Sequence, residues 1–176
     1  MFFYPTFYTG KVTDISLQIL NYLNIKSVIL DVDDTLVAHK TSDPNAEIVE
    51  WINMLKFNKL KIILLSNNFK NRVQSFADKL NIPYISLSMK PLTFGLKKAI
   101  NKLNTTPSEI LMIGDQIFTD VLAANISGIK SVLVDPIKES NSMMFKIKRC
   151  FENRIKRVLK SNPKFSLKSI SEDKSS

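Results

Sequence analysis

Residues 27–37 read SVILDVDDTLV, a short apolar run followed at once by three carboxylates, Asp31, Asp33 and Asp34. The first four residues have the look of a buried strand. Like charges this close repel one another, so a cation, a phosphate-handling reaction or plain solvent must compensate them. Side chains two positions apart in an extended segment point to the same side, so we expect Asp31 and Asp33 to face one site while Asp34 points elsewhere.

Similar apolar runs recur along the chain and alternate with helical patterns, which predicts an α/β fold built on a parallel sheet. The runs are nearly continuous in Ile, Leu and Val, as expected when helices cover both faces of the sheet. Segments such as AEIVEWINMLKF (46–57) space their apolar residues as amphipathic helices do. The five predicted strands are residues 27–30, 61–66, 84–88, 109–114 and 130–134.

The composition indicates one folded domain, because 176 residues with 44% hydrophobic and 23% charged side chains are typical of a globular chain. Cys150 is the only cysteine and His39 the only histidine, so an internal disulfide and a zinc site of the Cys/His type are both excluded. Any metal must be held by oxygen. The sequence also lacks a long apolar run and a secretion signal, so we expect a cytoplasmic protein without a membrane span.

Polar side chains follow the ends of the predicted strands. In an open parallel sheet, ligands bind beyond the carboxyl ends of the strands. Ser66 and Asn67 follow the second strand, Lys90 the third, and Asp115 the fourth, with Asp120 one helical turn further on. Acidic clusters on adjacent strands would be costly to hold together without a hard cation such as Mg²⁺, which prefers oxygen ligands.

These residues resemble the motifs of the haloacid dehalogenase-like (HAD) hydrolases. The segment DVDDTLV (31–37) fits the Asp-x-Asp-x-Thr first motif, Ser66 the second, Lys90 the third and GDQIFTD (114–120) the fourth. The resemblance covers residues 26–136, and the details LLSNN and KP look like the YqeG-type, subclass IIIA phosphatases, whose relatives include phosphatidylglycerophosphatases. It implies a three-layer αβα Rossmann-like fold with a central five-stranded parallel sheet.

The spacing of the motifs leaves no room for a cap domain. Between Asp31 and Ser66 there are 34 residues, and between Ser66 and Lys90 there are 23, enough for a flap, helices and one strand. By analogy with the family, an uncapped site stays open to large or membrane-held phosphates.

The resemblance also implies a role for each motif residue. Asp31 would attack phosphorus to form an aspartyl-phosphate, and Asp33 would protonate the leaving oxygen and later deprotonate water. Ser66, the backbone amide of Asn67, and Lys90 would bind the phosphate. The residues that would hold Mg²⁺ are Asp31, Asp33 through its carbonyl, Asp115 and Asp120.

Three other residues lie in or near the motifs. Thr35 is expected to fix the turn after the first strand by a local hydrogen bond. His39 lies on the flap after that strand, and its role stays open. Arg72 lies one turn into the next helix, where it could reach an anionic substrate or simply face solvent.

The excess positive charge belongs to the end of the chain. Residues 138–176 hold 11 Lys and Arg against 4 Asp and Glu, which is +7 of the net +9. Within them, apolar residues every fourth position predict a basic amphipathic helix. We therefore divide the chain into a phosphatase domain (1–137), this helix on or beside the domain (138–161), and a flexible tail (162–176).

Three interpretations of this helix remain. Its apolar stripe could complete the core, or its charges could bind anionic lipid at the inner face of the membrane; RNA is less favoured, since few aromatic side chains offer stacking. The leading function is a Mg²⁺-dependent phosphatase acting on a lipid phosphate such as phosphatidylglycerophosphate. The alternatives are a soluble nucleotide or sugar phosphatase, and an RNA- or ribosome-associated binding protein that keeps the fold.

Overall fold

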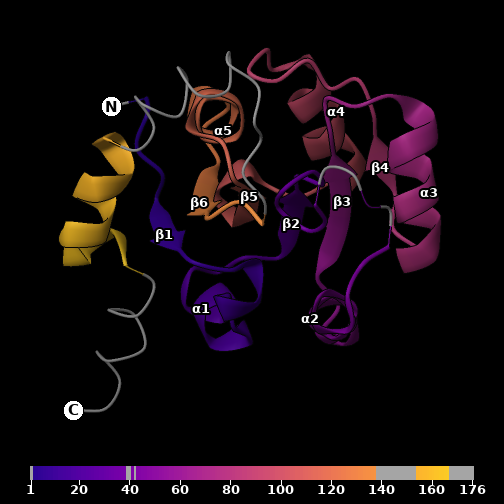
Figure 1. The fold of residues 1–176 in the computed structure, drawn as a ribbon, viewed down its shortest axis with the longest axis horizontal. Coiled ribbons are helices and arrows are strands. Elements are labelled where there is room, and N and C mark those ends of the chain that lie inside the picture. Colours follow the sequence, from indigo (N-terminus) through magenta and orange to yellow (C-terminus); the bar gives the residue numbers. More distant parts are fainter. Residues whose placement is uncertain (1, 39–40, 42, 138–153, 167–176) are drawn as a thin grey trace.

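The computed structural model describes residues 2–38, 41, 43–137 and 154–166, and within them one parallel sheet of six strands forms the centre of the molecule (Figure 1). The strand order across the sheet is β1-β6-β5-β2-β3-β4. The strands are β1 (Phe7–Thr9), β2 (Ser27–Leu30), β3 (Lys61–Leu65), β4 (Tyr84–Ile85), β5 (Ile110–Gly114) and β6 (Lys130–Val134).

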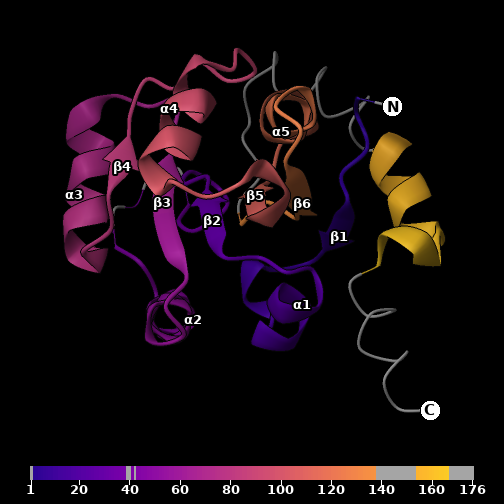
Figure 2. The same cartoon turned by 180° about the vertical axis from the view of Figure 1, so that it is seen from behind.

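Helices cover both faces of the sheet. One face carries α1 (Leu17–Tyr22) and α2 (Ala46–Phe57), and the opposite face carries α4 (Phe94–Leu103) and α5 (Leu122–Ile126), as Figures 1 and 2 show from front and back. Helix α3 (Lys70–Leu80) packs beside β4 and contributes to the same core as α1 and α2. The three-layer α/β architecture expected from the sequence is confirmed.

The two cores arise from the alternation of side chains along each strand. In β2, Val28 and Leu30 pack with α1, α2 and α3, whereas Ile29 packs with α4 and α5. Neighbouring β3 repeats the pattern, with Ile63 and Leu65 in the second core. Because side chains alternate with period two, a strand buried on both faces needs apolar residues at every position.

The sheet has one strand more than the sequence predicted. The count of five was wrong because β1 is only three residues long and lies at the edge, where its aromatic side chains are half-buried. It pairs in parallel with β6, Phe7 beside Val132. The predicted strand at residues 84–88 is also shorter than expected, since only Tyr84 and Ile85 pair with β3 and the chain then turns into a loop.

No cap domain is inserted among the described residues. Between β2 and β3 they form a loop followed by α2, and between β3 and β4 they form a loop followed by α3. In the same described part of the chain, none of the helices combines the length and the apolar character that crossing a membrane would require.

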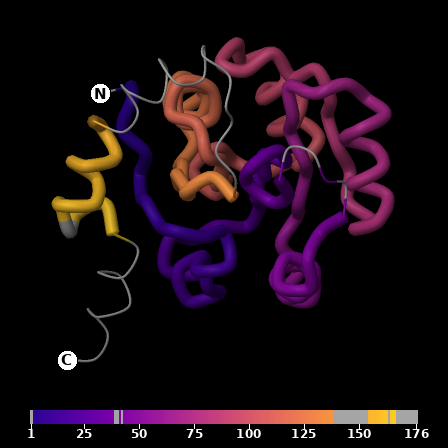
Figure 3. Tube along the Cα trace, in the orientation of Figure 1, coloured from indigo at the N-terminus to yellow at the C-terminus, as the bar shows by residue number. Residues whose placement is uncertain are grey.

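A helix at residues 154–161 lies beside the N-terminal segment, although the two are far apart in the sequence (Figure 3). Leu159 is buried in a small cluster with Leu133 of β6, and Tyr8 of β1 packs against that cluster. Lys156 and Lys160 both reach the carboxylate of Asp135, at 3.4 and 3.5 Å. The rest of the predicted basic helix (138–153) and most of the tail (167–176) lie outside the described residues.

Candidate active site

The structure brings the predicted residues together at the carboxyl edge of the sheet. Asp31 directly follows β2, and its amide donates to the carbonyl of Ile113, which extends the β2–β5 ladder by one rung. Asp115 directly follows Gly114, the last residue of β5. Since β2 and β5 are neighbours and Leu30 pairs with Ile113, Asp31 lies opposite Gly114 and Asp115 lies one residue further on at the same edge.

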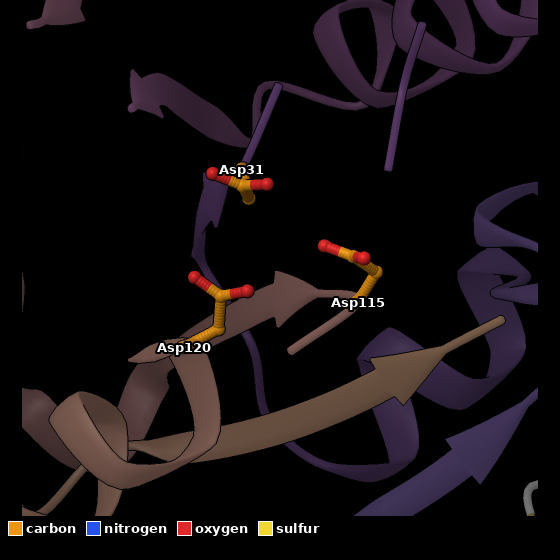
Figure 4. A group of neighbouring side chains, drawn as sticks. All are labelled: Asp31, Asp115 and Asp120. Carbon is orange, nitrogen blue, oxygen red and sulfur yellow. The ribbon is translucent and has the colours of Figure 1, made fainter. Parts of the chain in front are cut away.

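Three carboxylates face one another at this edge (Figure 4). Asp31, Asp115 and Asp120 are all buried, and each offers an oxygen within 4.8 Å of the other two. Asp120 comes from a short π-helical turn, Ile117–Val121, and accepts a hydrogen bond from the backbone amide of Gln116 through Oδ2 at 3.1 Å. The turn thus directs this carboxylate back toward the strand ends.

The ammonium of Lys90 closes the group. Its Nζ lies 2.5 Å from Asp31 Oδ1 and 2.6 Å from Asp120 Oδ1, and it donates to the carbonyl of Leu65 at 3.0 Å. The side chain is 2% exposed, so these contacts are shielded from water. Lys90 therefore supplies one fixed positive charge against three negative ones.

The electrostatics of the group indicate a shortage of positive charge. Burial, together with the charge of Asp120, raises the pKa of Asp31 to about 7 in spite of the opposing effect of Lys90. Burial also raises the pKa of Asp115 well above its usual range, and the neighbouring carboxylates add to the shift. For Lys90, burial alone would lower the pKa, but the two carboxylates outweigh it and raise the value.

The trio fits a divalent cation. All three donors are carboxylate oxygens, which suit a hard ion such as Mg²⁺. With Lys90 as the fixed partner, three ionised carboxylates leave two negative charges in a buried site, and a divalent cation would balance them. The acidic trio can therefore hold a metal ion, on the grounds of donor chemistry, burial and charge.

The carboxylate of Asp33 turns to a different set of partners. Arg72 donates from Nε to Asp33 Oδ1 at 2.7 Å, and its second guanidinium nitrogen lies 2.5 Å from the same oxygen. Asn68 donates to Asp33 Oδ2 at 2.7 Å, and Ser66 donates to it at 3.3 Å. Arg72 thus faces this aspartate, where the sequence left a choice between substrate contact and solvent.

The side chain of Asn67 joins the loop after β3 to the loop that carries Lys90. Its Oδ1 accepts from the Lys90 amide at 2.8 Å and from the Ser88 hydroxyl at 2.7 Å, and its Nδ2 donates to the Lys90 carbonyl at 3.0 Å. Two of these bonds fix the backbone of Lys90 and the third fixes the side chain of Ser88, so the position of Lys90 relative to the loop after β3 is defined.

Thr35 does more than hold a turn. Its hydroxyl lies 3.3 Å from Asp31 Oδ2 and 3.4 Å from Asp115 Oδ1, so it can donate to either carboxylate. The first contact is the local one expected from the sequence, but the second spans 80 residues. His39, whose role the sequence left open, falls outside the described residues.

Sequence reasoning missed three contributors to this geometry: Asn68, Thr35 as a link between strands, and Gly114. Asn68 could have been suspected as a further amide at a strand end. The role of Gly114 is a close approach, since a Cβ at this position would lie 2.4 Å from Cγ and Oδ2 of Asp120. Only the fold brings these atoms together.

A family model described as mitochondrial PGP phosphatase matches residues 1–138. The chain belongs to this family. It is 31% identical over 159 residues to the probable phosphatase YqeG of Bacillus subtilis, an alignment that covers 90% of this chain and 92% of the relative. It is also 31% identical over 150 residues to a probable mitochondrial phosphatidylglycerophosphatase of Schizosaccharomyces pombe, with 76% of this chain and 71% of the relative covered. The chain is accordingly a HAD-type phosphatase, a phosphoric monoester hydrolase.

Solved structures agree on the fold. A HAD-superfamily hydrolase from Ehrlichia chaffeensis superposes with a TM-score of 0.54 at 16% identity and covers 74% of this chain and 98% of its own. The deoxy-D-mannose-octulosonate 8-phosphate phosphatase of Haemophilus influenzae gives the same TM-score at 17% identity, with 66% and 70% covered. At these identities the likeness concerns the architecture alone.

Proposed function

We propose that this phosphatase is Mg²⁺-dependent and removes the phosphate from a membrane-held lipid phosphate such as phosphatidylglycerophosphate. The observation that carries the proposal is the buried group of Asp31, Asp115, Asp120 and Lys90 at an edge that no cap covers within the described residues. The names of the family and of the Schizosaccharomyces pombe relative point to phosphatidylglycerophosphate as the substrate class.

Asp31 acts as the nucleophile in this proposal. One of its carboxylate oxygens forms a bond to phosphorus, the bond from phosphorus to the ester oxygen breaks, and the alcohol leaves. An aspartyl-phosphate remains on the enzyme. The ion pair with Lys90 at 2.5 Å supports the choice, because the ammonium offsets the repulsion between an anionic nucleophile and an anionic phosphate.

Asp33 handles the protons. It protonates the oxygen of the leaving alcohol and then accepts a proton from the water that attacks the aspartyl-phosphate. That second attack breaks the bond between phosphorus and Asp31 and releases inorganic phosphate. The contacts from Arg72 and Asn68 hold this carboxylate in one orientation, which is what a proton-transferring group requires.

Phosphate binding falls to Ser66, the backbone amide of Asn67, and Lys90. These groups belong to two adjacent loops that Asn67 joins, so they can act on one phosphoryl group as a rigid set. Asp31, Asp115, Asp120 and the carbonyl of Asp33 would hold Mg²⁺. When bound, Mg²⁺ would neutralise charge on the phosphoryl oxygens and on the carboxylate trio.

The proposal is tested by hydrolysis assays with a generic soluble phosphomonoester and with phosphatidylglycerophosphate in detergent, each with and without Mg²⁺. We expect Asp31→Asn to abolish turnover of both substrates without loss of the fold, which circular dichroism would check. Asp115→Asn should raise the Mg²⁺ concentration needed for half-maximal rate. Full activity of Asp31→Asn would remove this residue as the nucleophile.

Hydrolysis of other phosphates and a binding assay with RNA separate the alternatives. Turnover of nucleotide or sugar phosphates with no turnover of the lipid would favour a soluble substrate, and salt-dependent RNA binding without turnover would favour a binding protein. Contact of the basic C-terminal helix with anionic lipid at the cytoplasmic face of a membrane remains part of the proposal. Among its described basic residues, Lys156 and Lys160 are engaged with Asp135, whereas Arg154 and Arg157 are exposed. These two arginines and the basic residues outside the described part would make that contact.

A further inference from the structure

Large apolar side chains gather on the loop after β3 and on the loop after β4, which carries Lys90. Of the twelve large hydrophobic residues exposed in the described part of the chain, five lie between residues 69 and 94. We call them the apolar rim: Phe69 (74% exposed), Leu87 (54%), Met89 (59%), Leu92 (50%) and Phe94 (69%). Singly exposed apolar residues are common, but a group beside a catalytic site marks an interaction surface.

Backbone contacts join the loops that carry the rim. The amide of Leu87 donates to the carbonyl of Asn68 at 3.0 Å, and the amide of Ser88 donates to the carbonyl of Ser66 at 3.0 Å. The start of α4 packs onto the same loop, since a Cβ at Gly95 would lie 2.6 Å from the Ser88 carbonyl oxygen. The rim is therefore one surface next to the site.

The loop after β4 displays two rim residues because it buries their neighbours. Ser88 and Lys90 point inward, at 1% and 6% exposure. Leu87, just before Ser88, and Met89, between Ser88 and Lys90, point outward. Both outward residues have a left-handed backbone, with φ of 48° and 59°, which side chains other than Gly or Asn rarely adopt. Strain of this kind persists where surrounding structure fixes it and is concentrated at functional sites.

The two segments that carry the rim contain charged residues of one sign. Residues 66–72 and 86–98 contain Lys70, Arg72, Lys90, Lys97 and Lys98 and no Asp or Glu. Arg72 and Lys90 are engaged in the site, whereas Lys70, Lys97 and Lys98 are exposed. Apolar side chains flanked by lysines form the pattern by which proteins enter the interface of an anionic bilayer.

We propose that the apolar rim docks this phosphatase on the surface of an anionic phospholipid bilayer, so that Lys90 and Asp31 meet a phosphate projecting from the headgroup layer. This inference rests on the proposed lipid-phosphate function and adds the surface through which the substrate arrives. It places membrane contact on the loops after β3 and β4, on a different part of the molecule from the basic C-terminal helix.

A second copy of the chain is a weaker candidate for the occupant. A twofold contact through the rim would set the exposed lysines of one copy against those of the other, and like charges across an interface oppose association. Anionic headgroups have the complementary charge. The lysines then gain counter-charges while the apolar side chains enter the acyl boundary.

The test replaces four rim residues by neutral polar ones that suit the local backbone. Phe69→Ser introduces a good N-cap residue at the start of α3, and Leu87→Asn and Met89→Asn place at both left-handed positions a residue that tolerates them. Phe94→Gln completes the rim variant. The matched control is Phe57→Gln with Tyr22→Gln, since these exposed apolar residues end α2 and α1 and precede the amino ends of β3 and β2.

Wild type, rim variant and control variant are compared in three assays. The first is sedimentation with phosphatidylcholine vesicles, prepared either with or without phosphatidylglycerol. The second and third are hydrolysis of phosphatidylglycerophosphate in vesicles and hydrolysis of its short-chain, water-soluble form. We expect wild type and the control variant to bind the anionic vesicles alike. The rim variant should bind them about tenfold more weakly or worse, a change of about 1.4 kcal/mol. Its rate on the vesicle substrate should fall by a much larger factor than its rate on the short-chain form.

The outcomes separate the two proposals. If no form of phosphatidylglycerophosphate is hydrolysed, the proposed function fails, while vesicle sedimentation still decides whether the rim docks on a bilayer. If the lipid is hydrolysed but the rim variant sediments and turns over vesicle substrate as wild type does, the rim inference is overturned. It is also overturned if wild type ignores anionic vesicles; a dimer in ultracentrifugation that the rim variant cannot form would then make a second copy of the chain the occupant of the rim.

Discussion

Gly114→Ala should disable the site from the interior of the fold. A Cβ on Gly114 would lie 2.4 Å from Asp120 Cγ and Oδ2 and 2.6 Å from Asp120 Cβ. Non-bonded carbon atoms normally approach to about 3.5–4.0 Å, so the Asp120 side chain must move by roughly 1 Å. Because the short contacts include Cβ, rotation of the carboxylate alone cannot relieve them, and the carboxylate leaves its place beside Lys90.

A displacement of about 1 Å in a catalytic constellation typically costs about 10²-fold in rate. We therefore expect kcat to fall by about that factor and the Mg²⁺ concentration for half-maximal rate to rise. Overpacking of about 1–3 kcal/mol should also lower Tm by about 2–10 °C. The assay is hydrolysis of a soluble phosphomonoester over a Mg²⁺ titration, together with a thermal melt.

Gly10→Ala is the matched control, since its nearest neighbour would be Asp14 Oδ2 at 3.8 Å, an ordinary contact. This variant should keep its rate, its Mg²⁺ dependence and its Tm. Gly114→Ala behaving like the control in all three would show that the position of Asp120 does not depend on this close approach, and would refute the reasoning.

Three further predictions follow from single contacts. Arg72→Gln removes a partly buried ion pair with Asp33 and should lower kcat more than it raises KM in steady-state assays; an effect on KM alone would make Arg72 a substrate-binding residue. Burial alone would raise the pKa of Asp135, but its contacts with Tyr8, Lys156 and Lys160 outweigh burial and lower that pKa. The ionised carboxylate therefore stabilises the fold at pH values above the unfolded-state pKa near 4, and this stabilisation is lost as the pH falls through the folded-state pKa. Asp135→Asn should therefore lower Tm by a few degrees at pH 7 and by less at pH 3, whereas an equal loss at both would exclude the ionic contribution. Mg²⁺ at about 100 times its Kd should stabilise the fold by about 2.7 kcal/mol, which a thermal melt would show as a higher Tm. Asp115→Asn removes one repelling carboxylate, so it should raise the Tm of the metal-free protein and reduce the increase in Tm that Mg²⁺ causes.

The fold was largely predictable because burial on two faces leaves a strong signal. Most residues of the central strands are Ile, Leu or Val, as in β2, β3, β5 and β6. Short runs of this kind between amphipathic helices are typical of parallel strands buried on both faces. The edge strand β1 left no such signal, since three half-buried residues with aromatic side chains fit a packed loop equally well. Its pairing with β6 depends on contacts more than 120 residues apart.

The gathering of candidate site residues at one edge of the sheet was predictable, but the contacts among them were not. Strand ends bring Asp31 and Asp115 to one edge whatever the details of the loops, because parallel strands share that edge. Lys90 lies five residues beyond the end of β4, and its place depends on the loop that Asn67 holds. The pairing of Asp33 with Arg72 depends on how α3 starts relative to β2, and no spacing in the sequence encodes that distance. The left-handed turns at Leu87 and Met89 were equally hidden, because neither position holds a glycine.

Asn67 links catalysis to the presentation of substrate. Its side chain fixes the backbone of Lys90 and the hydroxyl of Ser88, and this same loop carries Leu87 and Met89 outward. In the two proposals, one amide therefore positions both the charge that would meet the phosphate and the loop that would meet the bilayer. The described residues form no cap over the site. If the rim enters the bilayer as proposed, the depth of its entry would determine how far the lipid headgroup reaches into the site. The link through Asn67 would then set the distance between the substrate phosphate and the carboxylate trio. A cap would enclose the substrate from above; here the membrane itself would form the opposite wall.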